Sequence, residues 1–324
     1  MKILLIGKNG QVGWELRRTL APLAEVVAVD YPEINFSDVP ALRRFVAATR
    51  PVVVVNAAAY TAVDKAETET ELCRQVNAVA PGVLAEEAKK LGALMVHYST
   101  DYIFDGTKTS PYVETDAPNP LGAYGRTKLE GDRAVKASRA NHLIFRLCWV
   151  YGARGQNFML TMQRLARERE KLRVVGDQFG CPTWSRMIAE TTALVLKQVV
   201  AGADASKFNG EYHLAASGHA NWHEFASRII ELMPEAERKC RAVEKITTAE
   251  YPTPAKRPAY SVLDCGKLQK TFGLRLPDWE TSLRQVQDQP RNCSSLAAPA
   301  SSAPISSTTS LTVRRSKDLS IWIA

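Results

Sequence analysis

The first residues of the chain constrain its fold most, because an apolar run leads directly into a loop with three glycines. Residues 3–6 are apolar and predict a buried strand, and residues 7–13 read G-K-N-G-Q-V-G. A helical pattern begins at Gln11 and stops at Pro22. Glycines let the backbone turn tightly and approach a ligand, and a helix N-terminus attracts an anion. The segment therefore predicts a binding site for the pyrophosphate of a dinucleotide.

The residues after this loop extend the predicted cofactor site. The glycine spacing is G-x-x-G-x-x-G, and Asp30 ends the next apolar run. A carboxylate there can accept hydrogen bonds from the adenosine ribose and would repel a 2′-phosphate. Lys8 inside the loop would partly offset that repulsion, so we expect NADPH or NADH as the cofactor. The predicted contacts are Gly7, Asn9, Gly10, Gln11, Val12, Gly13 and Asp30.

Strand-like and helix-like segments alternate through the first half of the chain. Such alternation predicts a parallel sheet covered on both faces, which is a doubly wound α/β (Rossmann) fold. The predicted strands are 3–6, 25–29, 51–55, 94–98 and 142–147, and the predicted helices are 11–20, 41–49, 69–91 and 124–137.

The pattern changes after residue 150, where the alternation becomes irregular and segments rich in Pro and Gly appear. We therefore expect a dinucleotide-binding domain at 1–150, with its sheet completed by later segments, and a smaller C-terminal substrate-binding lobe at 151–288. Residues 289–324 are rich in Ser, Ala, Thr and Pro, a composition that predicts a disordered tail.

Composition excludes several classes of protein. The 324 residues are 45% hydrophobic and 23% charged, as in an ordinary globular protein, and the net charge of +8 comes without a Lys/Arg run in the body. That balance suits an anionic small substrate better than nucleic acid. No stretch approaches the roughly 20 apolar residues of a membrane span. The six cysteines are scattered without a C-x-x-C pair, so we expect no metal site, no disulfide framework and a cytoplasmic location.

Tyr124 and Lys128 form the strongest candidate for a catalytic pair. They stand four residues apart at the predicted start of a helix, so both side chains lie on one face. A cation near a phenol favours the phenolate, and we therefore expect Lys128 to lower the pKa of Tyr124 toward working pH.

Two predicted strands end in residues suited to the same site. N-A-A-A (56–59) follows one strand, and small residues there leave room for a cofactor. S-T-D-Y (99–102) ends the next, where the Thr100 hydroxyl is placed to hydrogen-bond a carbonyl oxygen. The carboxyl ends of parallel strands meet at one edge of a sheet, so these groups are expected beside Tyr124.

Together these motifs resemble the extended short-chain dehydrogenase/reductase superfamily. More narrowly, G-K-x-G-Q-V-G-W-E-L, N-A-A-A-x-T-A-V-D-K-A-E, H-Y-S-T-D-Y-x-F and Y-G-x-T-K-L resemble the dTDP-4-dehydrorhamnose reductase family. Later signatures agree, among them D-Q (177–178) with P-T (182–183) and Y-P-T-P (251–254) with R-P (257–258). The similarity runs from residue 1 to about 285.

The resemblance implies a reaction and a role for individual residues. The reaction is NAD(P)H-dependent reduction of the C4 keto group of dTDP-4-dehydro-6-deoxy-L-mannose to dTDP-L-rhamnose, a building block of cell-surface polysaccharide. Tyr124 resembles the proton donor, Lys128 the anchor of the cofactor ribose, and Thr100 the group that orients the keto oxygen. The implied cofactor contacts further include Ala57, Ala58, Ala59 and Thr61. The implied substrate contacts are Val63, Thr100, Tyr102 and Trp149, with Arg257 a candidate for the diphosphate.

One departure concerns magnesium, which links dimers in some members of the family. Glu15 is present, but Arg186 stands where a second carboxylate would align, and an arginine repels the cation. We therefore expect no Mg²⁺ bridge, solvated Glu15 and Glu190 side chains, and a monomer or weak homodimer.

Two alternatives stay open at this point. A nucleotide-sugar epimerase or dehydratase on the same fold needs further acid/base residues beside the threonine, typically an Asp-Glu pair, whereas Thr100 is followed by Asp101 and Tyr102. A non-catalytic, NADP-binding regulatory subunit needs none of the three residues Thr100, Tyr124 and Lys128.

Overall fold

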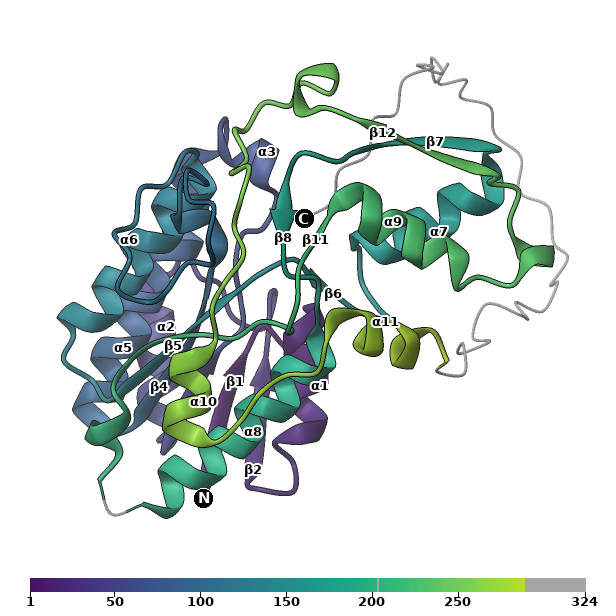
Figure 1. Ribbon diagram of the computed structural model, residues 1–324. Helices are drawn as coiled ribbons and strands as arrows, with labels where there is room; N and C mark the ends of the chain where they lie inside the picture. Colours follow the sequence, from purple (N-terminus) through teal and green to yellow (C-terminus); the bar gives the residue numbers. More distant parts are fainter. Residues whose placement is uncertain (203, 289–324) are drawn as a thin grey trace, which may run out of the picture.

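Six parallel strands form the central sheet of the protein, in the order β10-β5-β4-β3-β1-β2. The computed structural model describes residues 1–202 and 204–288, and Figure 1 shows the sheet enclosed by helices. The predicted doubly wound parallel sheet is confirmed. The strands are β1 (Lys2–Ile6), β2 (Glu25–Val29), β3 (Val53–Asn56), β4 (Leu94–Thr100), β5 (His142–Leu147) and β10 (Gly210–His213).

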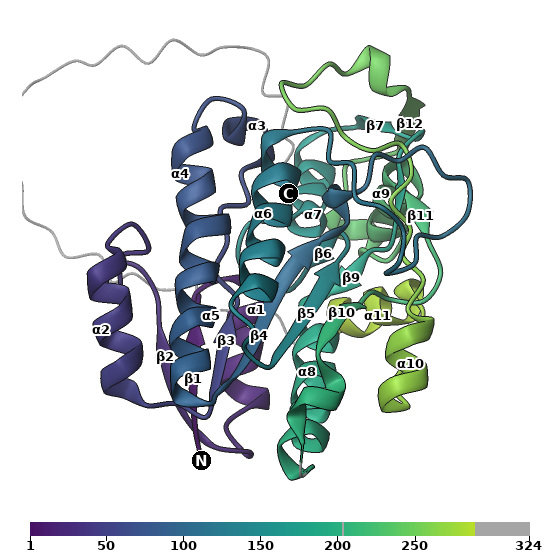
Figure 2. The ribbon, with the colours of Figure 1, turned by 90° about the vertical axis from the view of Figure 1, so that its left-hand side faces the viewer.

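Alternate residues of each buried strand point into two separate cores. On β1, Ile3 and Leu5 face one core while Leu4 and Ile6 face the other, and all four are fully buried. Burying one such side chain contributes about 1.5–3 kcal/mol, so both faces need a helical cover. Figures 1 and 2 show α1, α8 and α10 over the first face and α2, α5 and α6 over the second. These helices are α1 (Gln11–Thr19), α8 (Ser185–Ala201), α10 (Gly266–Phe272), α2 (Val39–Thr49), α5 (Ala80–Leu91) and α6 (Ala123–Ala137).

The single helix predicted at 69–91 is present as three segments, α4 (Thr70–Arg74), a π-helical turn η1 (Gln75–Val79) and α5. Pro81 lies in the first turn of α5 and has no N–H to donate to the carbonyl of Asn77, so a regular ladder cannot continue there. Helix α6 packs closely on this turn, since a Cβ on Gly131 would lie 2.1 Å from the Asn77 carbonyl oxygen. A short helix, α3 (Val63–Ala66), precedes α4.

A smaller lobe stands beyond the carboxyl ends of the strands, at the upper right of Figure 1. Its parallel pair β7 (Lys171–Val175) and β12 (Ala242–Ile246) packs on α7 (Phe158–Glu168) and α9 (Trp222–Glu231) around a separate apolar core. A capping box between Asn221 and Glu224 starts α9. After this lobe segment, the chain supplies α8 and the edge strand β10 to the main sheet.

Short elements complete the described chain. Two small strand pairs join the lobe to the sheet, and four 3-10 turns lie in the loops. They are β6 (Val150–Tyr151), β9 (Thr183–Trp184), β8 (Phe179–Gly180), β11 (Ala220–Asn221), η2 (Asp101–Ile103), η3 (Ala205–Phe208), η4 (Glu235–Glu237) and η5 (Thr248–Glu250), with α11 (Trp279–Gln287) as the last helix. The tail predicted to be disordered, 289–324, lies outside the described residues.

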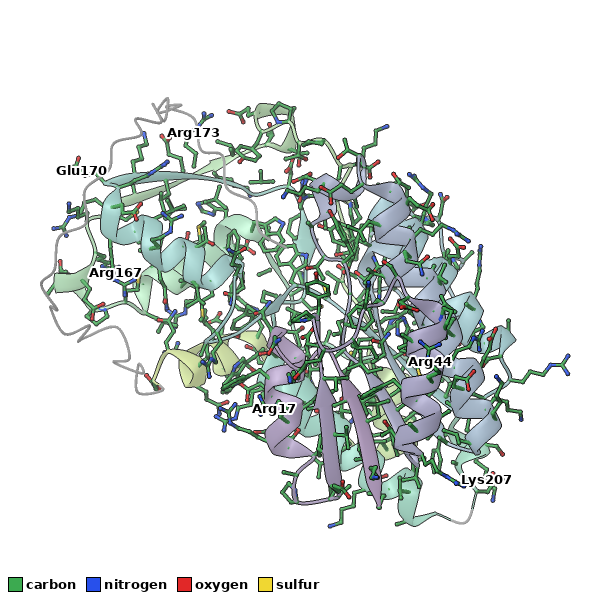
Figure 3. All side chains as sticks on the ribbon, turned by 180° about the vertical axis from the view of Figure 1, so that it is seen from behind. Arg17, Arg44, Arg167, Glu170, Arg173 and Lys207 are labelled. Carbon is green, nitrogen blue, oxygen red and sulfur yellow. The ribbon has the colours of Figure 1, made fainter. Side chains whose placement is uncertain are left out.

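Charged side chains project from many elements rather than gathering at one place. Figure 3 labels Arg17 on α1, Arg44 on α2, and Arg167 and Arg173 in the lobe. Within residues 1–202 and 204–288, no helix combines the length and apolar character that crossing a bilayer requires.

Candidate active site

A cavity of about 1100 Å³ runs from the N-terminal glycine loop, across the carboxyl ends of the strands, to the smaller lobe. Seventeen of the sequence-predicted site residues line it, and Gly13 is the one that does not. The lining residues are Gly7, Asn9, Gly10, Gln11, Val12, Asp30, Ala57, Ala58, Ala59, Thr61, Val63, Thr100, Tyr102, Tyr124, Lys128, Trp149 and Arg257. Residues far apart in the sequence therefore share one chamber.

Two of the glycines are required by close backbone contacts. Gly7 has a φ of +87°, and a Cβ there would lie 2.5 Å from the backbone nitrogen of Ala58. Gly13 faces back onto the loop, where a Cβ would lie 1.9 Å from the Gly7 carbonyl oxygen. Gly13 thus allows α1 to pack directly beneath the loop that carries Gly7 and Gly10. This packing brings the N-terminus of α1 to the cavity, where a pyrophosphate would meet it.

The carboxylate of Asp30 is fixed by the backbone around it. Its Oδ2 accepts a hydrogen bond from the Asn9 N–H at 2.9 Å, and its Oδ1 accepts from the Tyr31 N–H at 2.8 Å. Lys8, which we expected to offset repulsion of a 2′-phosphate, forms an ion pair with Glu33 at 2.5 Å. The Glu33 carboxylate therefore partly neutralises the positive charge of Lys8.

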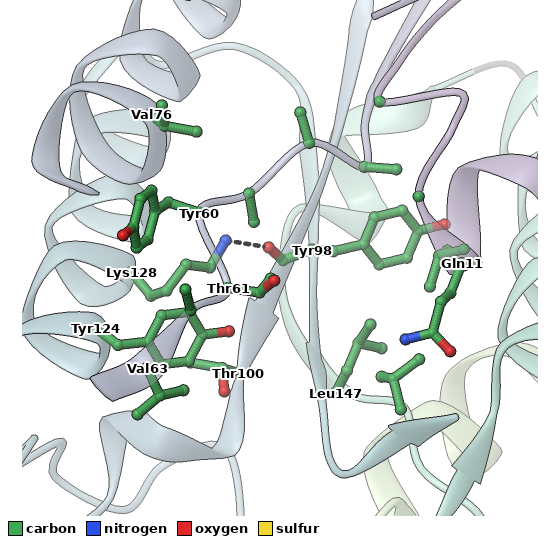
Figure 4. Close-up of a pocket in the computed structure, with 18 of the residues that line it drawn as sticks. Gln11, Tyr60, Thr61, Val63, Val76, Tyr98, Thr100, Tyr124, Lys128 and Leu147 are labelled. Atoms are coloured by element: carbon green, nitrogen blue, oxygen red, sulfur yellow. Dashed lines mark hydrogen bonds between the residues drawn. The ribbon is translucent and has the colours of Figure 1, made fainter. Parts of the chain in front are cut away.

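Tyr124 and Thr100 meet where α6 passes the end of β4. Figure 4 shows their side chains directed toward each other. The Thr100 hydroxyl donates to Asp101 Oδ1 at 3.1 Å and accepts from the Tyr102 N–H at 3.2 Å. The Tyr102 ring packs edge-on against Tyr124, with centroids 5.6 Å apart. These contacts hold both hydroxyl groups in the cavity wall.

We expected Lys128 to lower the pKa of Tyr124, and this prediction is wrong. Burial raises the pKa of Tyr124, while hydrogen bonding by Thr100 lowers it by less. The reason is that removing a phenolate from water outweighs the favourable neighbours. Tyr124 therefore stays protonated across the neutral range, which suits a proton donor.

Lys128 lies almost completely inside the protein, with 1% of the residue exposed. Its Nζ donates a 2.6 Å hydrogen bond to the Tyr98 carbonyl oxygen, drawn as a dashed line in Figure 4. Burial lowers its pKa from 10.5 to about 8, whereas Asp132 raises it. The ammonium thus sits near its own titration range, an arrangement typical of functional sites.

Asp101 is a buried acid of the S-T-D-Y motif to which the sequence assigned no role. Its Oδ2 accepts from the Ser261 hydroxyl at 2.5 Å and from the Cys148 thiol at 3.1 Å. Burial raises its pKa to about 6, against these hydrogen bonds. Asp101 thus ties the loop around Ser261 to the end of β4, beside Thr100.

The lobe side of the cavity is aromatic, and sequence reasoning missed most of it. Trp149 has a φ of +44° and stacks on Trp222 with ring centroids 3.5 Å apart. Gly180 lies against the Trp149 indole, because a Cβ there would be 2.4 Å from it. The missed lining residues are Tyr151, Phe158, Trp222 and Phe225. The one available signal was the apolar spacing of 222, 225 and 229, which predicts a buried helix face and not a cavity.

Arg257 lines the cavity while held by an acid from the other part of the chain. Its guanidinium hydrogen-bonds both carboxylate oxygens of Asp64 on α3, at 3.1 and 2.9 Å, and Tyr102 is a further neighbour. Such two-point pairing fixes the orientation of an arginine. The predicted diphosphate contact would therefore come from an arginine already aligned by Asp64.

The residues considered for magnesium form ion pairs within their own helices. Arg186 contacts Glu190 at 3.2 Å on α8, and Arg18 lies 3.8 Å from Glu15 on α1. The described residues hold no group of three or more His, Cys, Asp or Glu side chains arranged for a metal ion.

Known proteins resemble this chain over nearly its whole described length. Residues 1–292 match the family described as RmlD substrate binding domain. A dTDP-4-dehydrorhamnose reductase from Burkholderia thailandensis is 49% identical over 86% of this chain and 95% of its own length. The solved dTDP-4-dehydrorhamnose reductase from Clostridium acetobutylicum is 39% identical, with a TM-score of 0.81 over 89% of this chain and 99% of that one.

A second solved relative contains a nicotinamide nucleotide. The dTDP-4-dehydrorhamnose reductase from Bacillus anthracis, crystallised in complex with NADP, is 32% identical with a TM-score of 0.80 over 88% of this chain and 98% of that one. The sequence motifs, the fold and these similarities agree, and the chain belongs to the dTDP-4-dehydrorhamnose reductase family.

Proposed function

We propose that this protein reduces the C4 keto group of dTDP-4-dehydro-6-deoxy-L-mannose to give dTDP-L-rhamnose, with NADPH as the reductant. The observation that carries the proposal is the meeting of Tyr124, Thr100 and Lys128 in the cavity that begins at the glycine loop. The same activity is named for the relatives that cover most of the chain.

The residues present fit a dinucleotide. Gly7 and Gly10 offer close approach of the backbone, the N-terminus of α1 supplies N–H groups, and Ala57 to Ala59 leave open space along the cavity. Asp30 is oriented for ribose hydroxyls, and Lys128 is the candidate anchor of the second ribose. A bound NADPH supplies the hydride. The solved relative with NADP supports this cofactor, and NADH stays an alternative.

The chain's own residues supply the proton and the orientation. Tyr124 keeps its phenolic proton because burial raises its pKa, so it can donate to the oxygen at C4 as negative charge develops there. The Thr100 hydroxyl lies beside it and can donate to the same oxygen once its proton turns from Asp101. A positioned acid contributes about 10²- to 10⁴-fold to the rate, and alignment adds to this.

The substrate then lies between the sheet and the lobe. Val63 and Tyr102 come from the sheet side, and Trp149 comes from the aromatic wall. We assign Arg257, aligned by Asp64, to the diphosphate. In this proposal residues 1–150 chiefly bind the cofactor and residues 151–288 chiefly complete the substrate site.

The two alternatives are disfavoured by particular residues. A dehydratase needs a free acid pair after the threonine, whereas Asp101 is hydrogen-bonded to Ser261 and Cys148, and Tyr102 follows it. A purely regulatory subunit has no need of Thr100, Tyr124 and Lys128 in one cavity.

Oligomeric state and location belong to the same proposal. The Arg186–Glu190 ion pair competes with any cation at that place, which supports a monomer or weak homodimer without a magnesium bridge. Sedimentation with Mg²⁺ and with a chelator tests this directly. The five free cysteines of the described residues fit a cytoplasmic enzyme.

The test mixes the purified protein with NADPH and the dTDP-bound keto-sugar and follows the loss of reduced-cofactor absorbance. The proposal expects oxidation that depends on the sugar, with dTDP-L-rhamnose as the product in NMR spectra. A rate no higher than that of a Tyr124→Phe variant would overturn it. The same assay with NADH measures cofactor preference.

A further inference from the structure

A buried polar chain runs from the cofactor side of the sheet to α6, behind the Tyr124–Lys128 pair. The Ala58 N–H donates to Asn56 Oδ1 at 3.2 Å, and the Asn56 side-chain amide contacts His97 Nδ1 at 3.2 Å. His97 in turn faces Asp132, with 3.6 Å between Nε2 and Oδ1. The side chains of Asn56, His97 and Asp132 are at most 2% exposed, so all three lie in the interior.

The hydrogen bonds determine which way His97 carries its proton. Asn56 Oδ1 already accepts from Ala58, so the group that meets His97 is the amide NH₂, which can only donate. His97 Nδ1 is therefore an acceptor. Burial lowers the pKa of His97 well below 6.5, and the nearby Lys128 charge lowers it further, so the ring is neutral. Its one proton then sits on Nε2 and points at Asp132.

Asp132 has one polar neighbour at each carboxylate oxygen. Ser99 donates a hydrogen bond to its Oδ2 at 2.7 Å. Its Oδ1 makes no hydrogen bond with the described residues and lies 3.6 Å from Nε2 of His97. Hydrogen-bond donors stabilise a buried carboxylate as an anion. Burial raises the pKa of Asp132 from 3.8 to about 6, while Lys128, Ser99 and Arg146 on β5 lower it and Glu211 on β10 raises it further. The carboxylate is therefore an anion above about pH 6.

Lys128 lies one helical turn from this anion. Tyr124, Lys128 and Asp132 occupy positions i, i+4 and i+8 of α6, so their side chains share a face with neighbours about 5–6 Å apart. The other groups that face the ammonium are His97 and the Tyr98 carbonyl on β4 and Cys73 on α4. Two neighbours raise the pKa of Lys128 and so favour its charged form. Asp132 has the larger effect and Cys73 the smaller.

We propose that Asp132 is the counter-charge of Lys128 and a positioning residue of the site. Hydrogen-bonded by Ser99 and facing His97, it keeps the buried lysine protonated and so sets the upper pH limit for binding the cofactor. The inference rests on the proposed function, since it takes Lys128 as the anchor of the cofactor ribose. It adds a role to Asp132 and His97, which are not among the residues that line the cavity.

The experiment is a titration of NADPH binding to Asp132→Asn protein, followed by cofactor fluorescence from about pH 6 to about pH 10. Asparagine keeps the shape of Asp132 and removes its charge. The ammonium then loses its counter-charge, so the pH at which affinity falls should move down by about one pH unit. Asp132→Glu keeps the charge and should retain the wild-type midpoint.

Glu130→Gln is the matched control, because it removes a carboxylate from the exposed face of the same helix, where Glu130 pairs with Arg74. Its midpoint should equal that of the wild type. A uniform loss of affinity in Asp132→Asn at every pH, with the midpoint unchanged, would mean a merely structural role and overturn the proposal.

A fourth variant covers the case in which Asp132→Asn does not fold. Ser99→Ala removes one donor from the anion and leaves its charge, so a smaller downward shift is expected, and no shift would contradict the inference. The titration uses no sugar. Failure of the wild type to reduce the keto-sugar would therefore count against the proposed function alone.

Discussion

The Lys128 ammonium donates a 2.6 Å hydrogen bond to the carbonyl oxygen of Tyr98, joining α6 to β4. Tyr98 stands two residues before Thr100, and Lys128 stands four after Tyr124. This one contact therefore fixes the helix that carries the phenol against the strand that carries the threonine hydroxyl. The geometry of the site is set by the packing of two regular elements, which is more rigid than a loop.

Replacing Lys128 by Met should weaken both NADPH binding and turnover. Methionine fills similar space but cannot donate a hydrogen bond, and a hydrogen bond from a charged group is worth about 1.5–3 kcal/mol, or roughly ten- to a hundredfold in affinity. Fluorescence titration measures the binding and the oxidation assay measures turnover. Lys65→Met, at the exposed rim of the same cavity, is the control and should change neither by more than a few-fold. Lost turnover with unchanged binding would refute the anchor role.

Tyr124→Phe should bind NADPH as the wild type does and reduce the keto-sugar about 10²- to 10⁴-fold more slowly. The variant removes one hydroxyl from a half-buried ring and leaves the edge-on contact with Tyr102 in place. Tyr60→Phe is the matched control, because Tyr60 lines the same cavity with its hydroxyl bonded to Glu69. Equal rate losses in the two variants would show that neither phenol is the specific acid.

Gly7→Ala should destabilise the protein and abolish tight cofactor binding, because the residue has positive φ and its Cβ would meet the Ala58 backbone at 2.5 Å. Gly92 also has positive φ, +66°, but a Cβ there meets nothing within 4 Å. Gly92→Ala should therefore cost only the conformational strain, about 1–2 kcal/mol. Urea unfolding should show the larger loss for Gly7→Ala. Equal losses of stability in the two variants would mean that the glycine loop can move to accommodate the added Cβ.

The buried carboxyl group of Asp101 should make the stability of the protein depend on pH. Burial raises its pKa from 3.8 to about 6, so the folded state holds a proton that the unfolded chain releases between these values. The contribution is present below about pH 4 and is lost as pH rises through about 6. The free energy of unfolding of the wild type, minus that of Asp101→Asn, should fall over this window by up to about 1.4 kcal/mol per pH unit. A difference that stays constant or rises, measured by denaturant unfolding, would contradict this ionisation.

The sheet and much of the candidate site could be predicted from local sequence patterns. The apolar run before Gly7, the alternation of strands and helices, and the spacing of Tyr124 and Lys128 are all short-range features. The carboxyl ends of parallel strands meet at one edge, so the motifs at 56–59 and 99–102 could be placed near each other without coordinates.

Other features depend on contacts that no local pattern encodes. Asp64 and Arg257 are 193 residues apart in the sequence. Trp149 and Trp222, which stack on each other, are also far apart in the sequence. The direction of the Tyr124 pKa shift also needed the structure, because spacing indicates the nearby charge and not the depth of burial. The π turn before Pro81 arises from the packing of α6 on Asn77 as well as from the proline.

The most direct test of the reductase function uses NADPH carrying deuterium at the reactive position of the nicotinamide. The protein is incubated with this cofactor and the dTDP-bound keto-sugar, and the product is examined by NMR and mass spectrometry. The proposal predicts dTDP-L-rhamnose with one deuterium at C4, formed by the wild type and nearly absent with Tyr124→Phe. A product without deuterium at C4, or equal labelling by the variant, would contradict it.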